Sequence, residues 1–232
     1  VICPSTLRTV WKKEFKKYAT GPYDFQIHEQ KAKWYDAFCD VQPTDRLQIL
    51  AVSVEGLGIS EALYHSVCRF YTAGRRILTI CDESSRIKNP DAKRTKRTIN
   101  LGTVSEYRLI LNGTPIALGI QDLWAQYEFL DPNIIGMGDY WAFKTRYVVM
   151  GGYENKQIVG YQNVEELMNL VAPYTCVVGK EVLNLPEKVF IERPVQVTPE
   201  QRRLLRLVVK GADADPNAPL IKVQNTLEKV LR

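Results

Sequence analysis

Two stretches decide the fold: R-I-L-T-I-C-D-E-S-S-R-I-K-N at residues 76–89 and Y-R-L-I-L-N-G-T-P at residues 107–115. Each opens with a short apolar run typical of a buried strand and continues into polar residues. Residues 91–101, which lie between them, read as a basic helix. Strand–helix–strand order with nearly continuous apolar strands predicts a parallel sheet. Its strands then end at one edge, where open α/β sheets bind ligands.

The same alternation extends on both sides of these stretches. We expect strands and helices, in alternation, at 1–3, 7–18, 25–28, 31–38, 47–54 and 61–71. Beyond residue 115, one helical face collects Ile116, Ile120, Leu123, Trp124, Tyr127 and Leu130. Asp131-Pro132 ends that helix. The predicted fold is α/β: a parallel sheet with helices on both faces.

The last third changes character. Residues 150–160 are glycine-rich with alternating polarity and predict a hairpin. Asn163 and Glu166 have the spacing of a capping box that opens a helix to Val171, and residues 198–201 form a cleaner box with proline at the first helical position. Residues 211–219 form a turn-rich break before a final helical stretch.

Composition limits the function classes only loosely. Hydrophobic residues make up 45% of the 232 and the net charge is +5, which suits a polyanionic partner without requiring one. No apolar run approaches the roughly 18 residues that span a bilayer, so we expect no membrane partner. The five cysteines are too scattered for a zinc site and odd in number, so we expect buried free thiols in a reducing compartment. Val1 lies in an expected strand, and we expect a fragment of a longer protein.

Asp82-Glu83 is the first candidate site. Two adjacent carboxylates at the carboxyl end of a parallel strand suit metal-assisted phosphoryl transfer, in which one holds Mg²⁺ and the other activates water. The alternative is a solvated acidic pair in an ordinary loop.

Asn112-Gly113-Thr114-Pro115 is the second candidate. Gly113 permits a tight turn, Thr114 can cap the next helix and Pro115 suits its first position. A well-built helix start explains these residues equally well, but not their position one strand–helix unit after the acidic pair.

Three further groups follow the other predicted strands or the acidic pair. These are Pro4-Ser5-Thr6, Ser53-Val54-Glu55-Gly56 and Arg86-Ile87-Lys88-Asn89. Small hydroxyls at a helix start are ready phosphate contacts, although capped surface helices look the same. The basic run 93–97 is more often a solvated face than a DNA contact.

Taken in order, these motifs resemble motifs Ia, Ib, II and III of superfamily-two motors. The extended forms D-E-S-S-R-I-K-N and R-L-I-L-N-G-T-P-I resemble the Swi/Snf-like branch, as do Leu123-Trp124 and Phe129-Leu130-Asp131-Pro132. V-G-K-E at 178–181 and L-P-E-K at 185–188 resemble the segment that closes its first lobe. Residues 158–167 look most like phage and bacterial members, which implies the cytoplasm of a bacterial or phage-infected cell.

The resemblance implies a RecA-like first lobe of an ATP-driven translocase. Asp82 would coordinate the Mg²⁺ of ATP through water and Glu83 would be the general base. Asn112, Gly113, Thr114 and Pro115 would couple nucleotide state to the track. The residues implied to contact double-stranded DNA, independently of its sequence, are Pro4, Ser5, Thr6, Ser53, Lys88 and Asn89.

It also implies three segments: the lobe-one core at 1–135, a helical and hairpin insertion at 136–197, and a helical linker at 198–232 toward a second lobe. The sequence departs from the family where Asn112 replaces the usual Thr or Ser and Ser85 replaces a residue often His or Gln. No G-x-x-x-x-G-K-[ST] occurs, so we expect the 232 residues alone to be inactive.

Three alternatives stay open. One is a strand-separating helicase or the motor of a restriction system. Another is a non-catalytic DNA-binding remnant, with no role for Asp82 or Glu83. The last is an unrelated α/β domain, which would place residues 82 and 114 on different edges of the sheet.

Overall fold

The computed structural model describes the chain in segments. They are residues 1–28, 38–39, 45–74, 76–179, 182, 189, 191, 198–203 and 205–206. The chain divides into two compact units, Val1–Val177 and Val178–Arg232, and each is described by itself.

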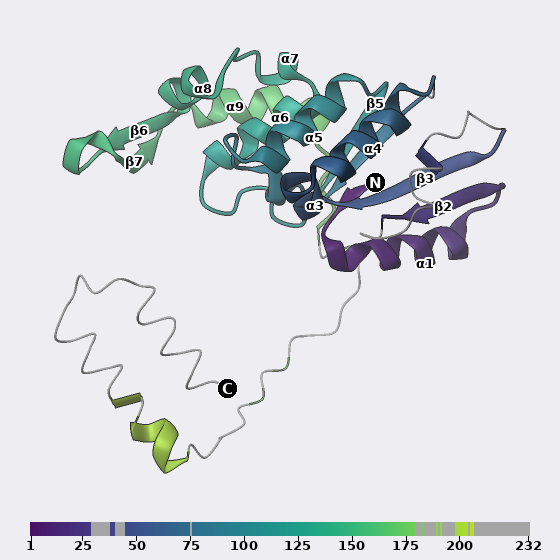
Figure 1. The fold of residues 1–232 in the computed structure, drawn as a ribbon. Coiled ribbons are helices and arrows are strands. Elements are labelled where there is room, and N and C mark those ends of the chain that lie inside the picture. Colours follow the sequence, from purple (N-terminus) through teal and green to yellow (C-terminus); the bar gives the residue numbers. More distant parts are fainter. Residues whose placement is uncertain are drawn as a thin grey trace. The chain divides into compact units, whose positions relative to one another are not determined.

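A five-stranded parallel sheet forms the centre of the first unit (Figure 1). Its strands are β1 (Ile2–Cys3), β2 (Tyr23–Ile27), β3 (Leu47–Ser53), β4 (Leu78–Asp82) and β5 (Tyr107–Leu111). They lie in the order β2-β3-β1-β4-β5, and every neighbouring pair is parallel. The predicted parallel sheet is confirmed, with β4 placed slightly later than expected so that Asp82 is its last residue.

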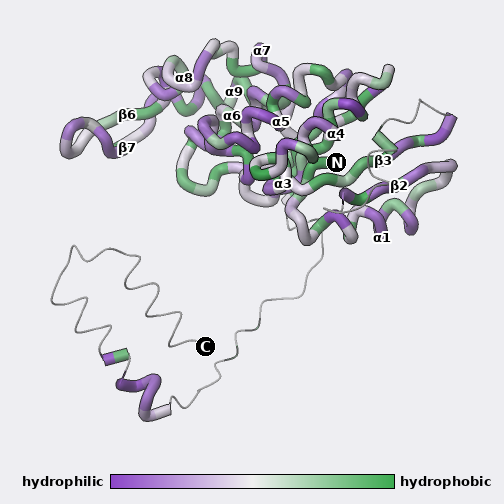
Figure 2. Tube along the Cα trace, viewed as in Figure 1, coloured by the Kyte–Doolittle hydropathy of each residue, from purple (hydrophilic) through white to green (hydrophobic). Residues whose placement is uncertain are grey.

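The helices of this unit follow the strands as the alternation predicts. They are α1 (Arg8–Tyr18), α3 (Val54–Ile59), α4 (Glu61–Thr72), α5 (Lys93–Thr103), α6 (Leu123–Leu130), α7 (Pro132–Ile135), α8 (Tyr140–Tyr147) and α9 (Val164–Val171). β3 shows how the two faces are covered, because successive side chains of a strand point to opposite faces. Ile49 and Ala51 pack with Phe15 of α1, whereas Leu50 and Val52 pack with α3 and α4. The hydrophobic course of β3 through the unit is visible in Figure 2.

The main core lies between the sheet and α3, α4, α5 and α6. Leu57, Leu63, Ile87 and Leu101 are almost completely buried there, and each such side chain stabilises the fold by about 1.5–3 kcal/mol. α5 and α6 approach closely at Gly102, where an added Cβ would lie 2.9 Å from the Phe129 ring.

One part of the sheet is bare. On β5, Tyr107, Leu109 and Leu111 are all more than a third exposed within the described part of the chain. α1 covers the sheet at β2 and β3 but does not reach this strand.

A second cluster joins α6 to the elements that follow it. Phe143 and Tyr147 of α8 and Leu167 of α9 are fully buried. β6 (Val148–Gly151) and β7 (Gln157–Tyr161) pair antiparallel between these helices, which confirms the predicted hairpin.

The predicted helix start at Thr114-Pro115 is wrong, since α6 begins only at Leu123. The Asp122 carboxylate accepts hydrogen bonds from the backbone N–H groups of Ala117 (3.0 Å) and Leu118 (2.8 Å). These bonds hold the preceding residues as a loop, because they satisfy N–H groups without a helical turn.

The predicted capping box at Asn163 is also wrong, although the helix it opens is present as α9. Asn163 adopts φ 51° and its amide donates to the Arg146 carbonyl at 2.9 Å. Glu166 does not reach back either, because it pairs with Arg146 and accepts the Tyr147 hydroxyl at 2.9 Å. Both capping side chains are engaged by α8 instead.

In the second unit the capping box at residue 198 is confirmed. Thr198 N–H donates to the Gln201 side chain at 2.9 Å, and Gln201 N–H donates to the Thr198 hydroxyl at 3.2 Å. The predicted break at 211–219 lies outside the described residues, as does the predicted helix 31–38 apart from Phe38.

Three of the five cysteines are buried as predicted, and two are not. Cys3, Cys39 and Cys81 are buried, Cys68 is half-buried and Cys176 is exposed. Burial raises the pKa of Cys3 to about 11 and that of Cys81 to about 12, so these thiols stay protonated. The described residues contain no cluster of three or more His, Cys, Asp or Glu side chains able to hold a metal ion. None of the described helices is long and apolar enough to cross a membrane.

Candidate active site at the carboxyl edge of the sheet

The acidic pair and the Asn-Gly-Thr-Pro turn lie at the same edge of the sheet. β4 and β5 are neighbours, and Asp82 is in register with Leu111. Glu83 and Asn112 therefore leave the sheet side by side. This is the placement that the sequence predicted, and it excludes the alternative with residues 82 and 114 on different edges.

Both carboxylate oxygens of Asp82 accept a hydrogen bond. Oδ1 accepts the backbone N–H of Glu83 at 3.0 Å. Oδ2 accepts the indole N–H of Trp11, from α1, at 2.8 Å. Each oxygen has two lone pairs, so each retains capacity for a further ligand. Nothing in the sequence pattern pointed to Trp11, because its place on the apolar face of α1 suggested core packing alone.

Glu83 has an unusual backbone conformation. Its φ of 52° and ψ of 54° place it in the left-handed region, which costs roughly 1–2 kcal/mol for a residue with a Cβ. Such strain concentrates at functional sites. Its carbonyl accepts the N–H of Arg86 at 2.9 Å, which starts the 3₁₀ turn Ser84–Ile87. The pair thus ends a strand and is not part of a helix.

A buried polar network joins the two loops. The Ser84 hydroxyl donates to Gln126 Oε1 at 2.6 Å, and Asn112 Nδ2 donates to the Ser84 hydroxyl at 3.2 Å. Gln126, on α6, is completely buried and donates to the carbonyls of Pro115 and Asp122, both at 2.8 Å. One amide therefore fixes the position of both loops relative to α6.

In the Asn112-Gly113-Thr114-Pro115 turn, Asn112 is the residue whose side chain joins this network. Thr114 N–H donates to Asn112 Oδ1 at 2.9 Å. The side chains of Thr114 and Pro115 are exposed, and so is Gly113. These residues are open to a ligand or a second domain, whereas Asn112 faces inward.

Lys88 and Asn89 lie beside this network. The Lys88 ammonium is 3.5 Å from Asp122 Oδ2, so it supports the loop that Asp122 organises. Asn89 is exposed, and its side-chain oxygen accepts the N–H of Asp91 at 3.0 Å. We call Asp82, Glu83, Ser84, Asn112 and Gln126 the β4–β5 rim.

The other half of the edge, the β1–β3 rim, is formed by Ser5, Thr6, Arg8, Ser53 and Glu55. Ser5 and Thr6 are exposed, and the Arg8 guanidinium binds the Ser5 hydroxyl at 2.8 Å and the His28 carbonyl. A cleft of about 460 Å³ is lined by Ser5, Arg8 and Ser53 together with residues of α3.

The remaining predicted DNA contacts of this rim are less accessible. Ser53 is buried and caps α3 by accepting the Gly56 N–H at 2.9 Å. Pro4 is buried as well.

The basic run 93–97 is not simply a solvated face. Arg97 is only 7% exposed, donates to the Leu57 carbonyl at 2.7 Å and pairs with Glu61. The positive charge of Arg97 therefore joins α5 to α3 and α4. Lys93 also pairs with Glu61, and both partners hold the pKa of that carboxyl below its usual value.

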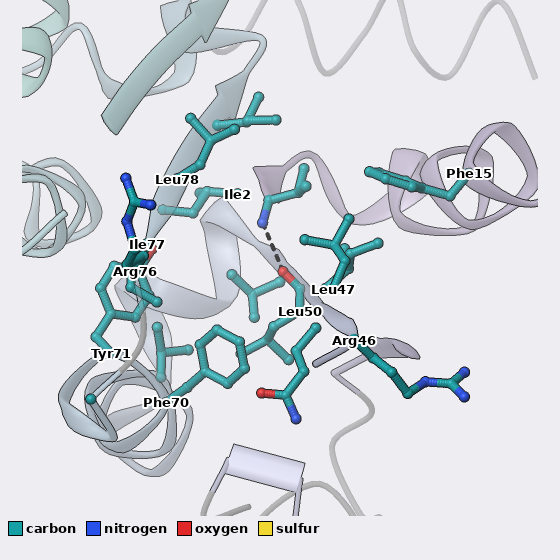
Figure 3. Close-up of a pocket in the computed structure, with 17 residues that line it drawn as sticks. Ile2, Phe15, Arg46, Leu47, Leu50, Phe70, Tyr71, Arg76, Ile77 and Leu78 are labelled. Atoms are coloured by element: carbon teal, nitrogen blue, oxygen red, sulfur yellow. Dashed lines mark hydrogen bonds between the residues drawn. The ribbon is translucent and has the colours of Figure 1, made fainter. Parts of the chain in front are cut away.

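A second cavity, of about 440 Å³, lies away from this edge (Figure 3). It is lined mainly by apolar side chains near the starts of β1, β3 and β4, including Ile2, Leu50 and Leu78. It therefore sits toward the amino ends of the strands and does not include the acidic pair.

The chain matches the SNF2-related domain family over residues 1–230. It is 28% identical to human DNA repair and recombination protein RAD54B over 199 residues, which is 82% of this chain and 20% of that protein. It is 32% identical to human helicase-like transcription factor over 139 residues, 58% of this chain and 13% of that protein. The chain thus spans about a fifth or less of these relatives.

Among solved structures, the chain is similar to the Sulfolobus solfataricus SWI2/SNF2 ATPase core in complex with dsDNA. The TM-score is 0.56 with 25% identity, covering 99% of this chain and 46% of that one. The expected RecA-like α/β fold is confirmed by this similarity. These relatives are human and archaeal, so they give no support to the expected phage or bacterial origin.

Proposed function

The chain belongs to the SNF2-related domain family, and we propose that it acts as the first lobe of an ATP-dependent motor that moves along double-stranded DNA. The carrying observation is the β4–β5 rim. Asp82 ends the strand next to β5, and the Ser84 hydroxyl binds both Asn112 and Gln126. Phosphoryl transfer coupled to movement needs acidic side chains that act on the nucleotide and a neighbouring turn that can contact it. The acidic pair and the Asn112 turn lie at adjacent strand ends and can supply both.

The residues of this rim fit Mg²⁺ carried by a nucleotide. The described chain has no cage of three or more acidic or His/Cys ligands, but Mg²⁺ usually binds through one or two carboxylates, water and substrate phosphates. Asp82 would supply that carboxylate through water, since both its oxygens keep a free lone pair. When bound, the ion would neutralise charge on the phosphates of ATP.

Glu83 is the proposed general base. Its left-handed backbone follows directly on the last residue of β4, and among the described residues none donates a hydrogen bond to its carboxylate. An unengaged carboxylate can orient the attacking water and accept its proton.

The β1–β3 rim is the proposed track contact. Exposed hydroxyls of Ser5 and Thr6 beside a cleft suit phosphate oxygens of DNA. The similar SWI2/SNF2 ATPase core was solved in complex with dsDNA, which favours a duplex as the partner. Contacts of this kind do not depend on base sequence.

Activity is proposed for the full-length protein that contains these residues. Residues 1–232 contain no G-x-x-x-x-G-K-[ST] loop, whose backbone and lysine cradle the β- and γ-phosphates in motors of this kind. We therefore expect negligible hydrolysis by residues 1–232 alone.

The test is an ATPase assay of the full-length protein with and without duplex DNA. We expect hydrolysis that duplex DNA stimulates, and none from residues 1–232. Duplex binding without any hydrolysis would instead support a non-catalytic DNA-binding protein, and separation of strands would support a helicase.

A further inference from the structure

The indole of Trp11 reaches the acidic pair from helix α1. Its N–H lies 2.8 Å from Asp82 Oδ2, across 71 positions of sequence. Asp82 is an acceptor when ionised, and a hydrogen bond to a charged oxygen is roughly twice as strong as a neutral one.

Two donors fix the rotation of the Asp82 carboxylate. Glu83 N–H binds Oδ1 and belongs to the same loop as Asp82, so it moves with that loop. Trp11 binds Oδ2 from α1, a separate element. Without the Trp11 N–H, the Asp82 carboxylate keeps only the donor from its own loop and can rotate about its Cβ–Cγ bond.

α1 is itself tied to the β1–β3 rim. Arg8 binds the Ser5 carbonyl at 3.0 Å, and the N–H of Ser5 donates to Glu55 at 3.3 Å. Trp11 lies one turn further along α1 and packs beside Phe15, with ring centroids 6.1 Å apart. A ligand that displaces the β1–β3 rim would therefore also move Trp11, because one turn of α1 connects them.

We propose that Trp11 is a positioning residue for Asp82, which makes the orientation of the metal-binding carboxylate depend on helix α1 and hence on DNA held at the β1–β3 rim. The proposal rests on the proposed function, because it takes Asp82 as the ligand of a nucleotide-bound cation. It assigns Trp11 no contact with nucleotide or DNA.

The chain offers a matched control for this hydrogen bond. The indole N–H of Trp124, on α6, is buried and has no hydrogen-bond partner in the described part of the chain. Trp11→Phe removes the hydrogen-bond donor to Asp82. Trp124→Phe removes an indole N–H that has no hydrogen-bond partner among the described residues. Phe15→Leu disturbs the packing of Trp11 and leaves its N–H in place.

The experiment measures the affinity of the full-length protein for a fluorescent ADP analogue, with and without Mg²⁺. The gain in affinity on adding Mg²⁺ is the quantity of interest, and we call it the Mg²⁺ gain. We expect Trp11→Phe to reduce the Mg²⁺ gain by about 10-fold, which is the lower end of the effect of losing a group that orients a metal ligand. Affinity without Mg²⁺ should not change. In steady-state hydrolysis with duplex DNA and Mg²⁺, KM for ATP should rise, because binding of the Mg²⁺-bound nucleotide is weakened, and kcat should fall. Trp124→Phe and Phe15→Leu should leave the Mg²⁺ gain unchanged.

An equal Mg²⁺ gain in Trp11→Phe and Trp124→Phe would overturn the proposal, and so would an equal loss in Trp11→Phe and Phe15→Leu. If Trp11→Phe does not fold, β-(3-benzothienyl)alanine at position 11 keeps the ring shape and replaces the N–H by sulfur. The variant Asp82→Asn separates failure of the proposed function from failure of the proposal about Trp11. Full ATP hydrolysis by Asp82→Asn would refute the proposed function. If Asp82→Asn loses hydrolysis while Trp11→Phe behaves as the wild type, only the role of Trp11 is refuted.

Discussion

The two halves of the sheet's carboxyl edge are held in different ways. At the β4–β5 rim the polar side chains bind one another: Ser84, Asn112 and Gln126 form a network around an amide with no solvent exposure. At the β1–β3 rim Ser5 and Thr6 are exposed residues beside a cleft, and the Ser5 hydroxyl accepts a solvent-exposed hydrogen bond from the Arg8 guanidinium. A fixed geometry suits chemistry that depends on position within a fraction of an ångström, whereas an open rim suits a long ligand that slides.

The largest expected effect is a loss of ATP hydrolysis caused by a change at the β4–β5 rim alone. Glu83→Gln keeps the size of the side chain and removes the base, so ATP hydrolysis by the full-length protein should fall by about 10²–10⁴-fold. Glu14→Gln, on the exposed side of α1, is the control and should hydrolyse ATP normally. A Glu83→Gln protein with the wild-type rate would refute the base assignment.

The next prediction tests the rigidity of the β4–β5 rim. Gln126→Leu should lower the free energy of unfolding by about 1–3 kcal/mol, because it leaves buried polar groups without partners. Chemical denaturation measures this. The control Gln157→Leu changes an exposed glutamine of β7 and should stay within about 0.5 kcal/mol.

Adding Ser84→Ala to Gln126→Leu should recover part of the loss, since removing both partners costs less than removing one. Asn112 is only half-buried and can turn to water. A double variant less stable than Gln126→Leu alone would show that the network is not the source of the stability.

The sequence predicted where these rims lie but not how they are held. Apolar runs ending at Cys81 and Leu111 sufficed to place both loops at one edge, because parallel strands share their direction. Gln126 was not foreseen: its neighbours Trp124 and Tyr127 belong to the predicted apolar face, and a polar residue between them suggests solvent. Its burial depends on the loop at Pro115, whose shape no local pattern reveals.

Local rules also failed where distant groups compete for the same side chain. Asn163 and Glu166 satisfy a capping pattern, yet α8 engages both. Thr114-Pro115 satisfies a helix start, yet the Asp122 carboxylate binds the following N–H groups first. Arg97 looked solvated because it stands in a basic run, and three-dimensional packing brought it to Glu61 and the Leu57 carbonyl.

A smaller effect is expected at the open rim. The double change Ser5→Ala with Thr6→Val removes two hydroxyls and should weaken duplex binding, each hydrogen bond contributing about 1 kcal/mol. The slope of affinity against salt should not change, because a neutral hydroxyl releases no counterion. Fluorescence anisotropy over a salt series measures both quantities. Thr9→Val, on the exposed face of α1, is the control, and equal affinities in all three proteins would exclude this rim as the track contact.

The smallest effect is expected far from either rim. Arg76 and Glu106 form a two-pronged surface pair near the starts of β4 and β5, at 2.9 and 2.8 Å. Hydrogen bonds from Arg76 lower the pKa of Glu106 from 4.5 to about 2. A lowered pKa in the folded state means that the stabilisation is complete above the ordinary pKa and is lost as the pH falls from 4.5 toward about 2.

Glu106→Gln should therefore be slightly less stable than the wild type at neutral pH, and the difference should shrink as the pH falls from 4.5 toward about 2, as measured by urea denaturation. Exposure to solvent keeps the difference small. A stability difference that grows on acidification would contradict the sign of this linkage.

The division of labour between the two rims is tested most directly by the affinity of the full-length Glu83→Gln protein for duplex DNA, measured by fluorescence anisotropy. The account predicts the wild-type affinity, because the β1–β3 rim that holds the duplex does not include Glu83. A loss of duplex binding in parallel with the loss of hydrolysis would show that the two rims are not separate sites.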